Sequence, residues 1–214
     1  MEYGVFPVSN WESELVRGKR YPLATPFGIG ENLDPLSMLK DEHSSILQRL
    51  YRLDKTMVLL ESSKPARSKR LLRSLLEESR KMWLELSQHT TKEDKVLFPL
   101  LEKRMGSEAG PVRVMSREHL ELLSSVVALR SEVQRSIEDD DALKTWNLAS
   151  ILQTLRAGLS DHISREERVL FWLAELRLSS VDRRKATFDL AQMSELSSDE
   201  SFRAQVPLTI RRTR

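Results

Sequence analysis

The stretch Asp161–Phe171, D-H-I-S-R-E-E-R-V-L-F, places a histidine and a glutamate four residues apart within a run of apolar repeats. Around it, apolar residues recur at steps of three and four, a spacing that keeps them on one face of an α-helix. The face expected from this spacing consists of Leu148, Leu152, Leu155, Leu159, His162, Glu166, Val169, Leu173 and Leu176. The sequence therefore predicts a long helix whose buried face is interrupted by His162 and Glu166.

Three further segments carry the same kind of repeat, and together the four predict an all-α protein. The segments span about 35–62, 66–105, 111–137 and 142–178. At the start of the first, Asp34 can cap the helix and Pro35 suits its first position. Long helices joined by short connections are typical of an up-down-up-down antiparallel four-helix bundle, so this is the predicted fold.

Both ends of the chain differ from this pattern, and they suggest a division into three parts. Residues 1–33 mix proline, glycine and aromatic residues, which predicts an N-terminal extended arm. The bundle domain is expected over 34–178. Residues 179–214 form a C-terminal extension, in which 181–196 can make one short helix and the rest is expected to be mobile.

Composition excludes several classes of function. The chain of 214 residues contains no cysteine, so disulfides, zinc–thiolate sites, iron–sulfur ligation and thiol catalysis are excluded. A formal net charge of +2 gives no sign of a nucleic-acid partner. The start of the sequence lacks the features of a secretory signal, and no apolar run approaches the roughly 18 residues of a membrane span. We expect a cytoplasmic protein without a membrane partner, and the sequence leaves its oligomeric state open.

The histidines form the most informative pattern in the sequence, because each of the four predicted helices carries one on its buried face. They are His43, His89, His119 and His162. Two of them are followed four residues later by a glutamate on the same face, Glu93 and Glu166. Each half of the chain thus repeats the order His, then His-x-x-x-Glu. In an antiparallel bundle all six side chains are expected at comparable height.

Elementary electrostatics indicates what such a cluster needs. Two buried carboxylates repel each other, and burying each one costs several kcal/mol. Four imidazoles cannot satisfy every nitrogen by donating to two carboxylates. One or two divalent cations solve both problems, with histidine nitrogens as terminal ligands and carboxylates as bridges. Imidazole and carboxylate without thiolate favour iron or manganese, and zinc is also possible.

These residues make the chain resemble the hemerythrin-like family of HHE cation-binding domains. The resemblance covers about 35–178 and rests on D-E-H-S-S-I (41–46), H-T-T-K-E-D-K-V-L-F-P-L-L (89–101), R-E-H-L-E-L-L (117–123) and D-H-I-S-R-E-E-R-V-L-F (161–171). It implies that the four histidines are terminal ligands and that Glu93 and Glu166 bridge two iron ions. The iron is expected as an Fe–O–Fe unit or as a ferrous pair.

Departures from the family pattern bear on function. Oxygen-carrying members have a further histidine where this chain has Leu122 or Leu123. Their last carboxylate stands one residue later, so the second bridge can be Glu166 or Glu167, and the register of the helix favours Glu166. The set of four histidines and two glutamates is more similar to bacterial members that repair iron centres after nitrosative or oxidative stress. Those often carry a cysteine-bearing N-terminal domain, which this sequence lacks.

The sequence leaves open the role of the neighbouring acids and the function of the whole protein. Glu42, Glu118 and Glu167 either orient the imidazoles or are solvated surface charges. The function expected first is a di-iron protein that binds or reacts with oxygen, nitric oxide or peroxide in stress defence or iron-centre repair. The alternative is a metal- or gas-sensing interaction module that signals through 1–33 or 179–214. A third reading is a metal-free helical scaffold.

Overall fold

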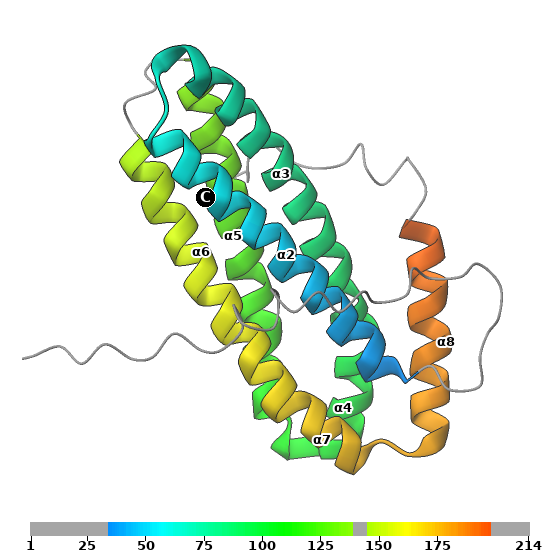
Figure 1. Ribbon diagram of the computed structural model, residues 1–214. Helices are drawn as coiled ribbons and strands as arrows, with labels where there is room; N and C mark the ends of the chain where they lie inside the picture. The colour runs from blue at the N-terminus through cyan, green and yellow to red at the C-terminus, as the bar shows by residue number, and fades with distance from the viewer. Residues whose placement is uncertain (1–33, 139–144, 198–214) are drawn as a thin grey trace, which may run out of the picture. The chain divides into compact units, whose positions relative to one another are not determined.

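The computed structural model describes residues 34–138 and 145–197, and it confirms the all-α prediction for this part of the chain. Four long helices lie side by side in Figure 1: α2 (Pro35–Glu61), α3 (Pro65–Lys92), α5 (Gly110–Glu138) and α6 (Thr145–Arg165). Along the chain each packs against the next, and α6 packs against α2, so that the four close into an antiparallel bundle. This is the predicted up-down-up-down architecture.

Two of the long helices contain a π-helical turn at the same relative place. After α3 come η1 (Glu93–Leu97) and α4 (Phe98–Met105), and after α6 come η3 (Glu166–Leu170) and α7 (Phe171–Arg177). In each π turn a backbone N–H reaches five residues back: Phe98 donates to the carbonyl of Glu93, and Phe171 donates to that of Glu166. Each helix therefore holds one more residue in this turn than an α-helix would.

Beyond Glu166 the buried face differs from the predicted one because of the extra residue. The sequence pattern placed Val169, Leu173 and Leu176 in the core, but Val169 is 42% exposed, Leu176 is 61% exposed and Leu173 is only partly buried. Leu170, Phe171 and Ala174 are buried instead. That prediction was wrong because it assumed uninterrupted α-helical periodicity, and a π turn rotates everything after it.

Helix ends in the structure follow the local signals in the sequence. The backbone N–H of Ser37 donates to the side chain of Asp34 at 3.2 Å, and Pro35 occupies the first turn of α2. Gly106 ends α4 with φ at +57°, a conformation that favours glycine. The short 3₁₀ turn η2 (Gly106–Glu108) then leads into α5.

Buried hydrophobic residues form two clusters along the bundle. The larger lies among α2, α3, α5 and α6, and includes Ile46, Leu86, Leu122 and Leu159. The smaller gathers the start of α2 and α5 with η1, α4, η3, α7 and α8, and includes Leu39, Val96, Met115 and Leu170. Along every helix, a histidine or a His–Glu pair separates the two clusters. The bundle therefore encloses a polar layer between two apolar ones.

The last described helix, α8 (Ser180–Ser197), matches the short helix predicted over 181–196. It lies beside the end of the bundle in Figure 1, and packs against α2, α3 and η1. Ala186 and Leu190 are buried there, and Arg104 of α4 pairs with Asp182. The predicted arm at 1–33 and the chain beyond 197 lie outside the described residues, so that division of the chain stays a prediction.

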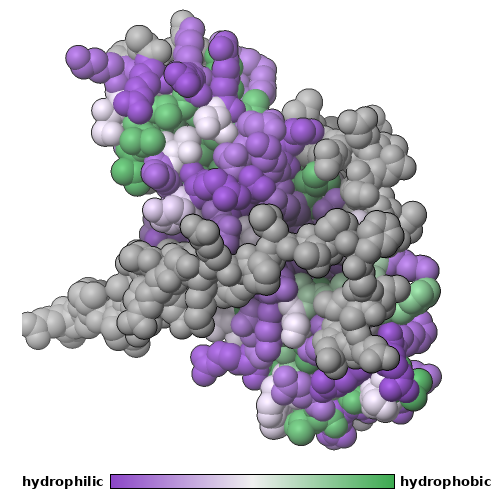
Figure 2. All heavy atoms as spheres, turned by 45° about the vertical axis from the view of Figure 1, so that its right-hand side comes forward, coloured by the Kyte–Doolittle hydropathy of each residue, from purple (hydrophilic) through white to green (hydrophobic). Residues whose placement is uncertain are grey.

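The outer faces of the bundle are mainly polar. In Figure 2 hydrophilic side chains cover much of the described surface on the side shown, interrupted by smaller hydrophobic patches. Among the described helices, none combines the length and the apolar character needed to cross a membrane.

Candidate metal centre

The six residues singled out in the sequence meet in the polar layer of the bundle. His43 comes from α2 and His119 from α5, whereas His89 and His162 lie in the last turns of α3 and α6. Glu93 and Glu166 are the first residues of the two π turns. All six side chains are almost fully buried, with 2% exposure or less.

Each buried carboxylate reaches imidazoles from both halves of the chain. Glu93 Oε2 lies 3.2 Å from His89 Nε2 and 3.3 Å from His119 Nε2. Glu166 Oε2 lies 3.3 Å from His43 Nε2 and 3.5 Å from His162 Nε2. The donor atoms form two groups within reach of a metal ion, one with His43 and His89 and one with His119 and His162. Both groups include both glutamates, which is the arrangement of bridging ligands.

Several buried polar atoms of the cluster have no hydrogen-bond partner among the described residues and are therefore available to bind a cation. Within the described part of the chain, both oxygens of Glu93 and Glu166 and the Nε2 atoms of His119 and His162 are buried without a hydrogen-bond partner. His43 Nε2 and His89 Nε2 are 3.0 Å apart. Two ligand nitrogens about 2.1 Å from one ion, at a right angle, lie at about this separation. The donor set therefore has the composition and the geometry of a metal-binding site.

Over residues 34–174 the sequence matches the Hemerythrin HHE cation binding domain. The chain belongs to the hemerythrin HHE cation-binding family. The family resemblance predicted from the four quoted motifs is thus confirmed.

Curated relatives cover only part of this hemerythrin-like chain. It is 37% identical over 89 residues to the "Iron-sulfur cluster repair protein YtfE" of Escherichia coli O157:H7, and equally to those of Escherichia coli strain K12 / DH10B and Shigella boydii serotype 18. The similar region covers 41% of this chain and 40% of each relative. No solved structure matches the chain significantly.

A carboxylate stands at the second nitrogen, Nδ1, of every histidine of this hemerythrin-like site. The four pairs are His43–Glu167 at 2.7 Å, His89–Glu42 at 3.0 Å, His162–Glu118 at 3.0 Å and His119–Asp94 at 3.2 Å. In each pair the acid and the histidine come from different helical segments, so the contacts run around the bundle. An acid at Nδ1 directs the proton to that nitrogen and leaves Nε2 as a metal ligand.

These contacts resolve most of the alternatives for the neighbouring acids. Glu42, Glu118 and Glu167 each contact an imidazole and are not merely solvated charges. Glu167 is 36% exposed and points at Nδ1 of His43, whereas Glu166 is fully buried among the Nε2 atoms. The geometry thus favours Glu166 over Glu167 as the bridging candidate.

Asp94 is the one acid of this set that reasoning from the sequence missed. It lies off the predicted buried face, because it directly follows Glu93. A signal for it exists in the internal repeat: H-T-T-K-E-D (89–94) corresponds to H-I-S-R-E-E (162–167), which aligns Asp94 with Glu167.

The family motif also explains the phenylalanines that end both π turns. The ring of Phe98 stacks on His119 with centroids 5.4 Å apart, and that of Phe171 stacks on His43 at 5.5 Å. The V-L-F sequences 96–98 and 169–171 thus each place an apolar wall against an imidazole of the other half. These walls help to exclude water from the polar layer.

Charges in the cluster shift the pKa values of its members. Burial lowers the pKa of His89, but Glu93 and Glu42 outweigh it and raise the pKa to about 10. Burial opposes protonation of His119 too, yet Asp94 and Glu93 raise its pKa to about 9. The imidazoles of His89 and His119 hold the pKa of Glu93 well below its usual range, although burial acts against this. A cation that binds here therefore replaces protons.

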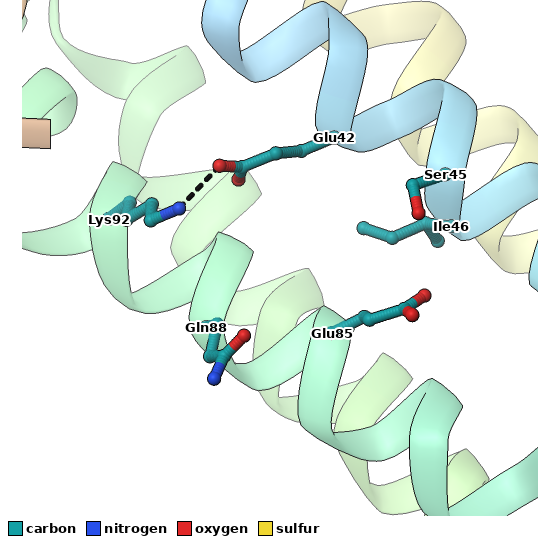
Figure 3. Close-up of a pocket in the computed structure, with 6 residues that line it drawn as sticks. All are labelled: Glu42, Ser45, Ile46, Glu85, Gln88 and Lys92. Carbon is teal, nitrogen blue, oxygen red and sulfur yellow. Dashed lines mark hydrogen bonds and ion pairs between the residues drawn. The ribbon is translucent and has the colours of Figure 1, made fainter. Parts of the chain in front are cut away.

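A small groove lies directly beside the centre, between α2 and α3 (Figure 3). It has a volume of about 110 Å³ and is lined by Glu42, Ser45, Ile46, Glu85, Gln88 and Lys92. Glu42 and Lys92 point toward each other and form an ion pair, and the same carboxylate accepts from His89 Nδ1. This ion pair stands between the groove and His89. A larger hollow lined by Arg67, Arg70, Leu71 and Ser74 lies away from the six residues and has no part in the centre.

Proposed function

We propose that this protein is a non-haem di-iron protein that reacts with a small molecule, namely oxygen, nitric oxide or peroxide, in iron-centre repair or stress defence. The observation that carries the proposal is the pair of His₂Glu₂ groups that share Glu93 and Glu166. The relatives named as iron–sulfur cluster repair proteins support the repair role and the choice of iron. Manganese and zinc suit the same donor types, so the metal itself belongs to the proposal.

The chain's own residues would each have a defined part. The four Nε2 atoms and the two shared carboxylates would hold the metal pair, which would supply redox chemistry when bound. The acids at Nδ1 keep each imidazole in the tautomer that a ligand needs. Phe98, Phe171 and the two apolar clusters surround the polar layer and would limit the access of water to it.

The absence of a histidine at Leu122 and Leu123 favours turnover over reversible oxygen carriage. Leu122 is buried in the larger hydrophobic cluster, and Leu123 packs against that cluster. Neither can ligate a metal, so the ion held by His119 and His162 has fewer protein ligands than in an oxygen carrier. An ion with more open positions is better suited to reaction or release than to stable carriage.

A stopped-flow experiment tests the proposal. The iron-loaded, reduced chain is mixed in turn with oxygen, nitric oxide and hydrogen peroxide, and the spectral change is followed over several cycles. We expect a fast reaction with nitric oxide or peroxide that is absent in the Glu166→Ala variant. Repeated reversible oxygen binding without oxidation would contradict the proposal.

A second candidate, a sensor that signals through its extensions, is favoured by the position of α8. This helix packs against η1, the π turn that begins with Glu93. A change in the metal state can therefore reach α8 through direct contact. Removing 1–33 and 198–214 leaves α8 in place and separates the two candidates. Unchanged gas and peroxide chemistry would leave these segments for signalling, and lost chemistry would make them part of the reactive protein.

A further inference from the structure

The two halves of the metal centre are built alike at His89 and His162. Both His89 and His162 face a glutamate at 3.0 Å, and in both cases a cation three residues after the histidine holds that glutamate. The cation is Lys92 for Glu42 and Arg165 for Glu118. These two contacts therefore do not distinguish the halves.

The contacts at His43 and His119 differ. His43 Nδ1 and Glu167 Oε1 form a hydrogen bond of 2.7 Å. Asp94 Oδ1 stands 3.2 Å from His119 Nδ1, and that nitrogen has no hydrogen-bond partner among the described residues. The physical reason is length, because aspartate is one methylene shorter than the glutamate at the corresponding place. In addition, Ser116 Oγ donates to the same oxygen at 2.8 Å.

The two histidine pairs also differ at their Nε2 atoms, which face the expected metal site. His43 Nε2 and His89 Nε2 converge to 3.0 Å, and their ring centroids are 4.6 Å apart. The rings of His119 and His162 are 5.0 Å apart, and neither Nε2 has a hydrogen-bond partner within the described ranges. The first pair is thus already spaced for one ion, and the rings of the second pair lie farther apart.

From these differences we propose that the metal held by His119 and His162 is the one released first, and that Asp94 is the positioning residue that sets its rate of release. The inference rests on the proposed di-iron site and deepens it, since a protein that repairs iron centres would supply iron from this position. Loss of a carboxylate that orients a ligand imidazole typically lowers metal affinity by 10–100-fold, and a longer contact is expected to weaken binding in the same direction.

The test uses the full chain loaded with ferrous iron and challenged anaerobically with an excess of a coloured ferrous chelator. We expect release in two phases of equal amplitude. Asp94→Asn should accelerate only the fast phase, by about tenfold or more, because the last orienting charge at His119 is lost. Asp94→Glu, which restores the reach of the corresponding Glu167, should slow the fast phase toward the slow one.

The matched control is Glu167→Gln, which should accelerate only the slow phase, because it acts on His43. Asp94 is 40% exposed, so Asp94→Asn should leave the melting temperature of the metal-free chain nearly unchanged. Release of both irons in one phase, or acceleration of the slow phase by Asp94→Asn, would overturn the inference while the di-iron proposal stands. A chain that takes up no iron would overturn the proposed function itself.

Discussion

His89 and Glu166 illustrate how single residues link stability to metal in this protein. Each is almost fully buried and contacts other members of the cluster. We expect His89→Ala and Glu166→Ala to lose most of their bound iron. The wild type should gain stability from iron by mass action, about 2.7 kcal/mol at a hundredfold excess over Kd, and the variants should gain almost none.

Thermal unfolding with and without iron measures this gain. Glu175→Ala is the matched control, since it removes an exposed carboxylate from α7 and should keep the full iron-dependent shift. Variants of His89 or Glu166 that keep that shift would show that these residues do not hold the metal.

Gly158 is a position at which we expect a substitution to increase the stability of the fold. It lies on an exposed face of α6, one turn before His162, and an added Cβ would meet Leu122 Cδ2 at 3.5 Å, an ordinary contact. Gly158→Ala should therefore stabilise the fold by about 0.5–1 kcal/mol, because alanine favours the helix over the unfolded chain. Chemical denaturation measures this change, and the iron content should stay the same. A loss of stability or of iron would mean that the glycine is needed for space beside the centre.

At the scale of single residues, the sequence was sufficient to identify the six buried residues. Histidines and glutamates on the buried faces of helices stand out from leucine, and chain order fixed their common height. Asp94 did not stand out, because an acid beside a buried face is ordinary. Its role depends on which imidazole of another helix it meets, and that is a property of the assembled bundle.

Among the elements, the π turns η1 and η3 are two that the sequence did not predict. Up to Glu166 the α-helical register is correct, and after it the register fails, as Val169 and Leu176 show. A π turn costs stability in an isolated helix and is common at functional sites. Both turns here begin at a bridging candidate, Glu93 or Glu166. We therefore expect the extra residue in each turn to help orient these carboxylates.

Deletion of Lys95, an exposed residue of η1, tests this interpretation. The deletion converts the turn to α-helix, and Leu97, Phe98 and Leu101 would then still follow Glu93 on the buried face. We expect a folded protein with a cooperative melting transition but with much less bound iron, because the directions of Glu93 and Asp94 change. Lys95→Ala, which removes the side chain without shortening the helix, should keep its iron. Full iron content after the deletion would separate the π turn from metal binding.

At the scale of the whole molecule, α8 belongs to the folded unit and is not merely a tail. Leu190 is buried in the smaller hydrophobic cluster, whereas Phe188 on the same helix is 59% exposed. Leu190→Ala should destabilise the protein by about 2–4 kcal/mol, which corresponds to a melting temperature lower by roughly 5–15 °C. Phe188→Ala should change stability by no more than about 0.5 kcal/mol. Equal effects of the two substitutions on the melting temperature would contradict the packing of α8.

The fold as a whole could be predicted because four amphipathic helices with short connections allow few arrangements. The division of the core into two apolar clusters around a polar layer also follows from where the histidines interrupt each helix. What the sequence could not give is the change of register at the π turns, since local periodicity contains no sign of an added residue. The pairings of Asp94 with His119 and of Glu167 with His43 depend on that register as well, because both acids lie within the π turns.

Metal analysis of the purified chain tests the central claim most directly. Protein prepared without added metal is analysed for iron, manganese and zinc, and an absorption spectrum is recorded on the same sample. We predict about two iron ions per chain, as expected for a carboxylate-bridged pair in a helical bundle, with charge-transfer bands in the near-ultraviolet. A chain that contains no metal and keeps its melting temperature after treatment with a chelator would contradict this claim, and the six residues would then be a polar network in a helical scaffold.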